Sequence, residues 1–221
     1  MSEQFSVTGL NRIKRVPKRA DYDKEGVYAV VDAALICHVG MVTDEGQPVV
    51  IPTIHARQGD NILIHGATTS RMLNYIGAGK PLCITITHLD GLVLARSVFH
   101  HSMNYRSAVL YGKGTLLTDP AEKMAALEIF TEKLIPGRWA DARMPNETET
   151  KATHIVSVPI DLASAKVRTG PPGDDEEDYA LDVWAGVLPM HTVFGDLQAD
   201  DQLKEGIKVP DYLREYAASK R

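Results

Sequence analysis

A run of small, hydroxylated and basic residues follows a predicted strand near position 65. His65 and Gly66 end the strand, and Ser70 and Arg71 begin a short predicted helix. Hydroxyl groups, free N–H groups at a helix N-terminus and a guanidinium can all donate to one anion, and a terminal phosphate needs several such donors at once. The segment is therefore a candidate phosphate site. The alternative is that Ser70 simply caps the helix and that Arg71 points into solvent.

A second polar cluster lies between two apolar segments. In the eight residues from His100 to Ser107, only Met103 is apolar. Burying such a segment without partners is costly, so we expect either an exposed loop or a loop whose polar groups bind a ligand. Tyr105 offers an aromatic face and Arg106 a fixed charge for such a ligand. A plain polar linker between two strands is the alternative.

The common signatures of other cofactor and catalytic sites are missing from the chain. There is no GxGxxG, GxxxxGK[ST], HExxH, CxxC or GxSxG, which argues against dinucleotide-binding, P-loop, zinc-hydrolase, dithiol and serine-hydrolase chemistry. Of the eight histidines, only His100 and His101 are neighbours, and adjacent residues of an extended strand point to opposite faces. We therefore predict no metal site made by the protein alone.

The composition is typical of a folded soluble chain, and the net charge gives no general attraction to nucleic acid or anionic membranes. Apolar residues make up 44% and charged residues 24%, and the formal charge is −5, so we predict neither nucleic acid nor a membrane as a partner. No apolar run approaches the ~20 residues of a spanning helix, and residues 1–8 do not resemble a secretory signal, so we expect a cytoplasmic protein. Cys37 and Cys83 lie in separate strand-like runs, where buried reduced thiols are expected.

Short strands dominate the predicted secondary structure. Strand-like runs occupy residues 34–41, 49–55, 62–65, 82–87, 92–95, 107–116, 154–158 and 165–168. The clearest helix follows Asp119-Pro120 and ends before Pro136, and an earlier one is expected with Asp21 as its cap. The basic segment 10–19 and the acidic segment 174–178 are expected in solvent. The pattern predicts a single mainly-β domain over residues 1–221, a β-barrel with peripheral helices, a basic N-terminal arm and a C-terminal extension.

Several motifs occur in order along nearly the whole chain. They are RVPKRADY (15–22), HVG (38–40), PVVIPT (48–53), IHG with SR (64–66 and 70–71), LDGLVLAR (89–96), HSMNYRS (101–107), PGRW (136–139), KVRTG (166–170) and WAGVLP (184–189). Together they resemble the FMN-binding split-barrel family, in the branch of the pyridoxamine 5′-phosphate oxidase-like and nitroimidazole-resistance proteins. The resemblance implies a split β-barrel and a homodimer with two FMN molecules at the subunit interface.

The resemblance also assigns cofactor contacts to residues of this chain. It places the flavin ring along the strand that contains Pro52 and Thr53 and the flavin phosphate at Ser70 and Arg71. The remaining implied contacts are His65, Gly66, Tyr105, Arg106, Ser107 and Trp184. Trp184 would cover the flavin from the partner subunit, and the alternative is a Trp buried in the core.

The expected function is an FMN-dependent oxidoreductase related to pyridoxamine 5′-phosphate oxidase. It would act on a small organic substrate, with a nicotinamide coenzyme as the candidate reductant. His65, with an unperturbed pKa of ~6.5, is either its catalytic proton donor or a structural histidine. Several alternatives stay open. They are a deazaflavin in place of FMN, a nitroreductase function, and a non-catalytic flavin or haem carrier or sensor in which His100 or His101 ligates iron.

Overall fold

The protein is built on two antiparallel sheets, which the computed structural model describes over residues 3–219. The larger sheet has the order β1-β10-β7-β6-β2-β3, with β11 added beside β6. Its strands are β1 (Ala20–Asp21), β2 (Ile36–Val42), β3 (Pro48–Ile54), β6 (Pro81–Leu94), β7 (Ser102–Lys113), β10 (Leu162–Arg168) and β11 (Gly186–Pro189). The smaller sheet has the order β4-β5-β9-β8 and contains β4 (Ala56–Gln58), β5 (Asn61–Ala67), β9 (Thr153–Pro159) and β8 (Thr115–Leu116). The mainly-β prediction of a split β-barrel is confirmed, and the first and last two residues of the predicted domain 1–221 lie outside the described residues.

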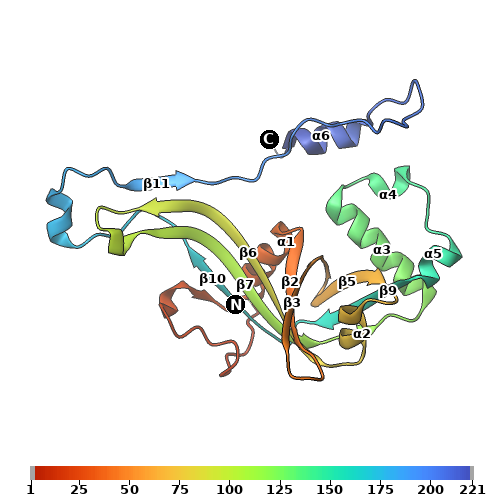
Figure 1. The fold of residues 1–221 in the computed structure, drawn as a ribbon, viewed down its shortest axis with the longest axis horizontal. Coiled ribbons are helices and arrows are strands. Elements are labelled where there is room, and N and C mark those ends of the chain that lie inside the picture. Colours follow the sequence, from red (N-terminus) through yellow and green to blue (C-terminus); the bar gives the residue numbers. More distant parts are fainter. Residues whose placement is uncertain (1–2, 220–221) are drawn as a thin grey trace.

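Helices lie around the sheets and not between strands of a parallel sheet (Figure 1). They are α1 (Lys24–Ala33), α2 (Arg71–Gly77), α3 (Pro120–Leu134), α4 (Arg138–Asp141), α5 (Glu147–Lys151) and α6 (Asp211–Ser219), with 3-10 turns η1 (Pro17–Arg19), η2 (Val98–His100) and η3 (Glu176–Ala180). As predicted, α3 begins with Asp119 as its cap, and the Asp119 carboxylate accepts a hydrogen bond from the N–H of Glu122. The predicted cap of α1 was wrong, because α1 begins after Asp23 and not after Asp21.

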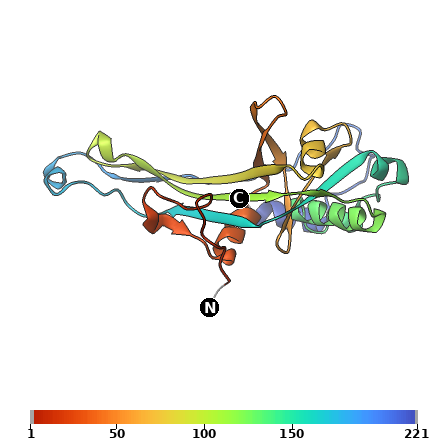
Figure 2. The ribbon, with the colours of Figure 1, turned by 90° about the horizontal axis from the view of Figure 1, so that it is seen from below.

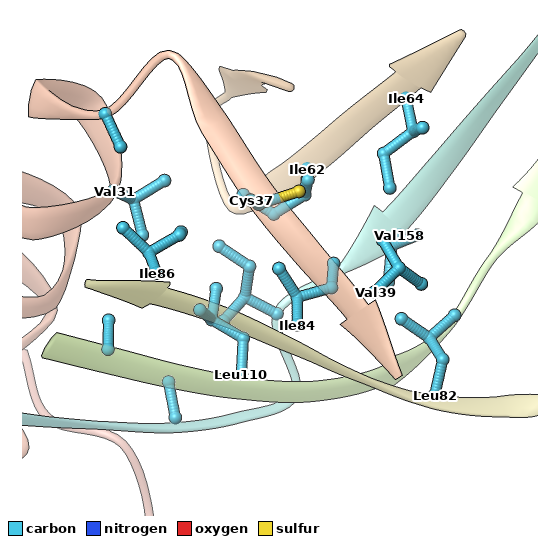
Figure 3. Packing of buried hydrophobic residues seen from close by; sticks show 14 of the residues in the cluster. Val31, Cys37, Val39, Ile62, Ile64, Leu82, Ile84, Ile86, Leu110 and Val158 are labelled. Carbon is cyan, nitrogen blue, oxygen red and sulfur yellow. The ribbon is translucent and has the colours of Figure 1, made fainter. Parts of the chain in front are cut away.

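The main core lies where the two sheets face each other below α1. Figure 3 shows Val39, Ile84 and Leu110 of the larger sheet packed with Ile62 and Val158 of the smaller one. A second, smaller core lies on the other face of the smaller sheet, where α3 covers β4, β5 and β9. Because successive side chains of a strand point to opposite faces, β5 contributes Ile62 and Ile64 to the first core and Leu63 to the second.

The β6–β7 hairpin is longer and more regular than the sequence pattern indicated. The runs 82–87 and 92–95 belong to one strand, since β6 continues through a bulge between Leu89 and Gly91. The polar cluster that was expected to form a loop is largely strand, because β7 begins at Ser102 and pairs with β6. Figures 1 and 2 both show this hairpin extending away from the end of the molecule that carries α2 and α3.

Beyond the hairpin, the chain forms a segment with little secondary structure, residues 190–210, which we call the strap. It begins after β11, whose pairing with β6 holds one end, and leads to α6. At the other end, the hydroxyl of Tyr212 donates to Asp141 at 2.8 Å and accepts from Arg138 at 3.2 Å, which docks α6 on α4. Figure 1 shows the strap running along the outside of the molecule between these two anchors. It exposes Val193, Leu197, Leu203 and Ile207.

Both charged segments that were expected in solvent contain buried anchors. In the acidic segment, the Asp174 side chain is fully buried and accepts hydrogen bonds from the backbone N–H groups of Arg96 (2.9 Å) and Ser97 (3.2 Å). In the basic segment, the buried Asn11 amide donates to the carbonyl oxygens of Ser6 and Ala163. These contacts tie both segments to the barrel.

The remaining expectations concern the thiols and membrane-spanning segments. Cys37 and Cys83 are both free; Cys37 is buried, as expected, whereas Cys83 is half-buried. Burial raises the pKa of the Cys37 thiol to about 12, so this group stays protonated. Within residues 3–219, no helix combines the length and apolar character that crossing a membrane requires.

Candidate functional site

The turn after β5 brings together most of the predicted phosphate-binding residues. It runs from Thr68 to Arg71 and leads into α2, and the Ser70 hydroxyl accepts from the N–H of Leu73 at 3.4 Å. The N–H groups of Thr68 and Ser70 are already bonded to the carbonyl oxygens of Ala152 and Ala67. The helix α2 has only seven residues, so few peptide dipoles add up at its N-terminus, and we assign no anion site to the helix end itself. The donors that remain for a ligand are the hydroxyls of Thr68 and Thr69 and the Arg71 guanidinium.

Arg71 is exposed, and its side chain forms no hydrogen bond or salt bridge with any residue between 3 and 219. A guanidinium is always charged and offers five donors in a planar fork, which matches a phosphate. Ser70 is thus the helix cap that the alternative interpretation expected, while Arg71 stays available for a ligand.

The predicted flavin-ring residues lie on a strand with a free edge. Pro52 and Thr53 belong to β3, which is the last strand of the larger sheet and pairs only with β2 there. The outer edge of β3 therefore keeps backbone donors and acceptors that no strand of the described chain uses. β3 also lies next to β5, so the free edge and the Thr68–Arg71 turn belong to neighbouring strands.

His65 points away from that turn. Gly66 lies on the α2 face of β5, where an added Cβ would contact Leu73, so the alternation of the strand places the preceding His65 on the α3 face. There its ring packs edge-on against Phe130, with the ring centroids 4.3 Å apart. The Nδ1 atom is buried without a partner, and burial lowers the pKa of His65 below its usual value. The imidazole is therefore neutral at pH 7.

The other predicted contacts lie far along the β6–β7 hairpin. Ser107 pairs with Thr87, whereas Pro81, which follows α2 closely, pairs with Lys113. Six residues of strand correspond to roughly 20 Å, so Tyr105, Arg106 and Ser107 do not meet Arg71 within one chain.

Arg106 has a partner in its own chain. Its guanidinium donates two hydrogen bonds to the Asp90 carboxylate, at 2.8 and 3.0 Å. The same contact lowers the pKa of Asp90 and raises that of Arg106. This bidentate pair sits at the bulge of β6 and was not expected from the sequence. The neighbouring Tyr105 is half-buried.

Trp184 is not a core residue. Its side chain is 70% exposed and lies against the backbone of Gly186, at the start of β11. Asp174, ten residues earlier, anchors this part of the chain to the hairpin through Arg96 and Ser97. The exposed indole is thus held beside the hairpin at the end of β6, since Gly186 pairs with Leu94, whereas Tyr105 pairs with Leu89.

The site residues therefore form two groups in one chain. Group one, near α2, contains Pro52, Thr53, Gly66, Ser70 and Arg71, with His65 behind it on the α3 face. Group two, on the hairpin, contains Tyr105, Arg106, Ser107 and Trp184. Asp90 and Asp174, which sequence reasoning missed, organise group two, and only their tertiary contacts distinguish them from other surface carboxylates.

One group of potential metal ligands also lies on the hairpin side. In the described chain, His100, Asp175 and Asp178 place one ligand atom each within 4.8 Å of one another. The Nε2 atom of His100 and the Asp175 carboxylate are 3.2 Å apart. A hydrogen bond between the His100 ring and the exposed Asp175 carboxylate accounts for this contact, and we assign no metal to the group.

Comparison with known proteins identifies the class. The family model described as pyridoxamine 5′-phosphate oxidase matches residues 23–167, so the chain belongs to this family. Among curated proteins, none matched the sequence.

Two solved structures resemble the chain over almost its full length. The flavocytochrome Anf3 from Azotobacter vinelandii is 38% identical, with a TM-score of 0.89 and coverage of 94% of this chain and 96% of that one. The FAD and haem binding protein from Mycobacterium smegmatis is 34% identical, with a TM-score of 0.85 and coverage of 89% and 96%. A putative 5-nitroimidazole antibiotic resistance protein from Bacteroides thetaiotaomicron shares the fold, at 24% identity, a TM-score of 0.57 and coverage of 67% and 86%.

Proposed function

We propose that this protein is a flavin-dependent oxidoreductase that works as a homodimer on a small organic substrate. The observation that carries the proposal is the uncommitted Arg71 guanidinium beside the free edge of β3. The two relatives that match over most of the chain support it, since one is a flavocytochrome and the other binds FAD and haem.

The residues of group one fit the parts of a flavin. The backbone at the free edge of β3 can bond the polar edge of the ring system, while Arg71 with the hydroxyls of Thr68 and Thr69 binds the phosphate. When bound, the flavin supplies hydride or single-electron transfer, and the chain supplies binding, orientation and electrostatics. A nicotinamide coenzyme is the proposed reductant.

The homodimer accounts for the separation between the two groups. In a dimer with a two-fold axis, group two of one chain can face group one of its partner, so that Tyr105 and Trp184 complete the partner's flavin site. The outer face of the larger sheet is suited to this contact. It exposes Val42 (53%) and Val50 (64%) around a hollow of about 640 Å³ at Gly40. Exposed apolar patches of this kind mark interaction surfaces.

Haem is a second candidate cofactor because both of these relatives are haem proteins by description. His101 is a poor iron ligand, since its Nδ1 accepts from the N–H of Ala95 and the neutral ring must then carry its proton on Nε2. His100 directs Nε2 toward Asp175.

The proposal is tested on freshly purified protein. Absorption bands of a flavin are expected, and a Soret band would add haem. Anaerobic mixing with NADH and NADPH should then bleach the flavin bands. Protein that contains no flavin, and that takes up none during reconstitution, would refute the proposal. If the protein binds flavin but shows no turnover, either with NADH or NADPH or with dithionite and a substrate, the protein is a flavin carrier and not an enzyme.

The catalytic role of His65 has a separate test. His65→Gln should retain flavin and lose reductive turnover if the imidazole handles a proton. Its contact with Phe130 predicts instead that stability falls while turnover per bound flavin is kept. A variant with wild-type turnover and an unchanged pH profile removes His65 from the mechanism.

A further inference from the structure

The basic segment 10–19 ends beside the strand that flanks group two. Its last residues form η1 and lead into β1, which pairs with β10. Figures 1 and 2 both show this part of the chain alongside β10. On its other side, β10 pairs with β7, where Lys166 lies opposite Ser107. Two residues further on, Arg168 lies opposite Tyr105. A single strand, β10, therefore separates the basic segment from group two.

Four cations lie along this strand, and no acidic side chain neutralises them. We call them the basic cluster, which consists of Lys18, Arg19, Lys166 and Arg168. Among residues 3–219, none of the four forms a salt bridge. The Arg168 guanidinium donates only to neutral oxygens, namely those of the Asn104 amide and of the Gly170 and Pro171 carbonyl groups. The basic cluster therefore keeps its positive charge for a ligand.

Asp21, the carboxylate closest in sequence to Arg19, points away from the basic cluster. Asp21 pairs with Ala165, whose side chain belongs to the main core. One of its carboxylate oxygens accepts a hydrogen bond from the N–H of Asp23 at 2.9 Å. The other oxygen lies where a Cβ of Gly26 in α1 would be. The carboxylate of Asp21 is thus directed toward α1 and does not oppose the binding of an anion at β10.

Two guanidinium groups of the basic cluster lie near enough to repel each other. Burial and, after it, the charge of Arg19 lower the pKa of Arg168. The backbone holds Arg19 in place, since its N–H donates to the carbonyl oxygen of Val16 at 3.1 Å. Val16 itself has a φ of 53° and a ψ of 63°, a left-handed conformation that a β-branched residue rarely adopts. A bound anion would offset the repulsion, and backbone strain of this kind is concentrated at ligand sites.

The charge of the basic cluster matches the one group that distinguishes NADPH from NADH. The two coenzymes differ by a phosphate on the 2′-hydroxyl of the adenosine ribose. A phosphate monoester carries about −1.5 to −2 charges at pH 7. In dinucleotide sites, an Arg beside the ribose accommodates this phosphate, whereas a carboxylate bonds the free 2′-hydroxyl of NADH. The basic cluster supplies the cations, and the nearby Asp21 carboxylate is directed elsewhere.

We propose that the basic cluster binds the 2′-phosphate of NADPH, so that NADPH and not NADH is the reductant. The proposal rests on the proposed function, because it names the reductant of the same flavin site. In the homodimer, group two would face the partner's flavin, and a coenzyme with its nicotinamide on that flavin can extend across β10 to the basic cluster. The coenzyme gives one hydride to the flavin and leaves as NADP⁺, while its 2′-phosphate is unchanged.

The test compares the two coenzymes on the flavin-loaded protein. Anaerobic stopped-flow mixing gives the second-order rate constant of flavin reduction at low coenzyme concentration. NADPH should react about a hundred-fold faster than NADH, because several charge-assisted contacts hold its extra phosphate. Arg19→Ala and Lys166→Ala should each slow the reaction with NADPH about ten-fold and leave the reaction with NADH unchanged. Lys151→Ala is the matched control, because it removes an exposed lysine paired with Glu147 on α5.

Adenosine 2′,5′-bisphosphate tests the phosphate contact without turnover. In calorimetry it should bind the flavin-loaded protein more tightly than adenosine 5′-monophosphate does, and Arg19→Ala should remove the difference. Circular dichroism and flavin content verify that the variants are folded.

Equal rates for the two coenzymes, or an undiminished preference for NADPH in both variants, would overturn the assignment while the flavin function stands. A bound flavin that neither coenzyme reduces would overturn it as well. If the folded protein takes up no flavin, the proposed function fails and the coenzyme assignment fails with it.

Discussion

Two arginines of the predicted site, Arg71 and Arg106, differ in whether an acidic side chain pairs with the guanidinium. The Arg106 guanidinium is satisfied by both oxygens of Asp90. The Arg71 guanidinium has no such partner among residues 3–219 and is exposed at the mouth of a cavity. At the scale of single residues, Arg71 is therefore the stronger candidate for an anionic ligand.

Replacing Arg71 should weaken flavin binding without unfolding the protein. A charge-assisted hydrogen bond contributes ~1.5–3 kcal/mol, so Arg71→Ala should raise the flavin Kd roughly ten- to a hundred-fold. Fluorescence quenching measures this affinity. Arg143→Ala, which removes an exposed arginine paired with Glu149, is the control and should leave the Kd unchanged.

His55 should make the protein sensitive to acid. Its ring is fully buried and donates from Nε2 to the carbonyl oxygen of Val31, near the end of α1, at 3.0 Å. Burial is the main cause that lowers its pKa to about 4. Because the unfolded chain binds the proton more tightly, with a pKa of ~6.5, stability is highest above pH 6.5 and falls as the pH is lowered toward 4.

The expected loss from this group is about 3 kcal/mol across that interval. Urea unfolding at several pH values measures it, and His55→Gln should flatten the dependence. A variant whose unfolding free energy falls as steeply as that of the wild type would show that other groups cause the acid sensitivity.

At the scale of elements, the two sheets meet where β7 passes β9. Gly112 of β7 faces the carbonyl oxygen of Pro159, and a Cβ at this glycine would overlap that oxygen. The close approach lets β7 run through the larger sheet while its far end contacts the smaller one. The barrel is thus closed by a backbone contact that requires the absence of a side chain.

Gly112→Ala should therefore destabilise the barrel. Overpacking of this kind typically costs about 1–3 kcal/mol, read as a lower midpoint in urea unfolding. Gly173→Ala is the matched control, because a Cβ there meets nothing within 4 Å. Equal midpoints for the two variants would mean that the β7–β9 contact adjusts without strain.

Elements with a strong local pattern were predictable from the sequence. The β2–β3 hairpin and α3 followed from β-branched runs, an Asp-Pro start and a helical period. The continuity of β6 was not predictable, because residues 88–91 are weak strand formers locally and are held in the strand by pairing with β7. The burial of Asp174 depends on partners 77 and 78 residues away.

The candidate site shows the same limit. The position of Ser70 and Arg71 at a turn was readable, since a strand pattern changes to a helical one there. The distance between these two residues and Tyr105 and Arg106 could not be predicted, because it depends on the register of the β6–β7 hairpin.

At the scale of the whole molecule, the exposed face of the larger sheet predicts a dimer. The protein should migrate with twice the mass of its 24.3-kDa chain. Val42→Glu places a charge beside the apolar hollow and should shift the protein toward monomer and lower its flavin content, as followed by light scattering and absorbance.

Met144→Glu is the control for this experiment. It adds the same charge at an exposed position between α4 and α5, away from the sheet face, and should leave the mass unchanged. A wild-type protein that is monomeric with full flavin occupancy would rule out the shared site.

The strap is anchored at both ends and forms no helix or strand between its anchors. A protease should cut first within residues 190–210, where the chain forms no helix or strand and most residues are exposed. The piece beyond the cut would keep its Tyr212 contacts on α4, and β11 would keep its place beside β6. A nicked molecule should therefore run as one species in a native gel and as two fragments in detergent.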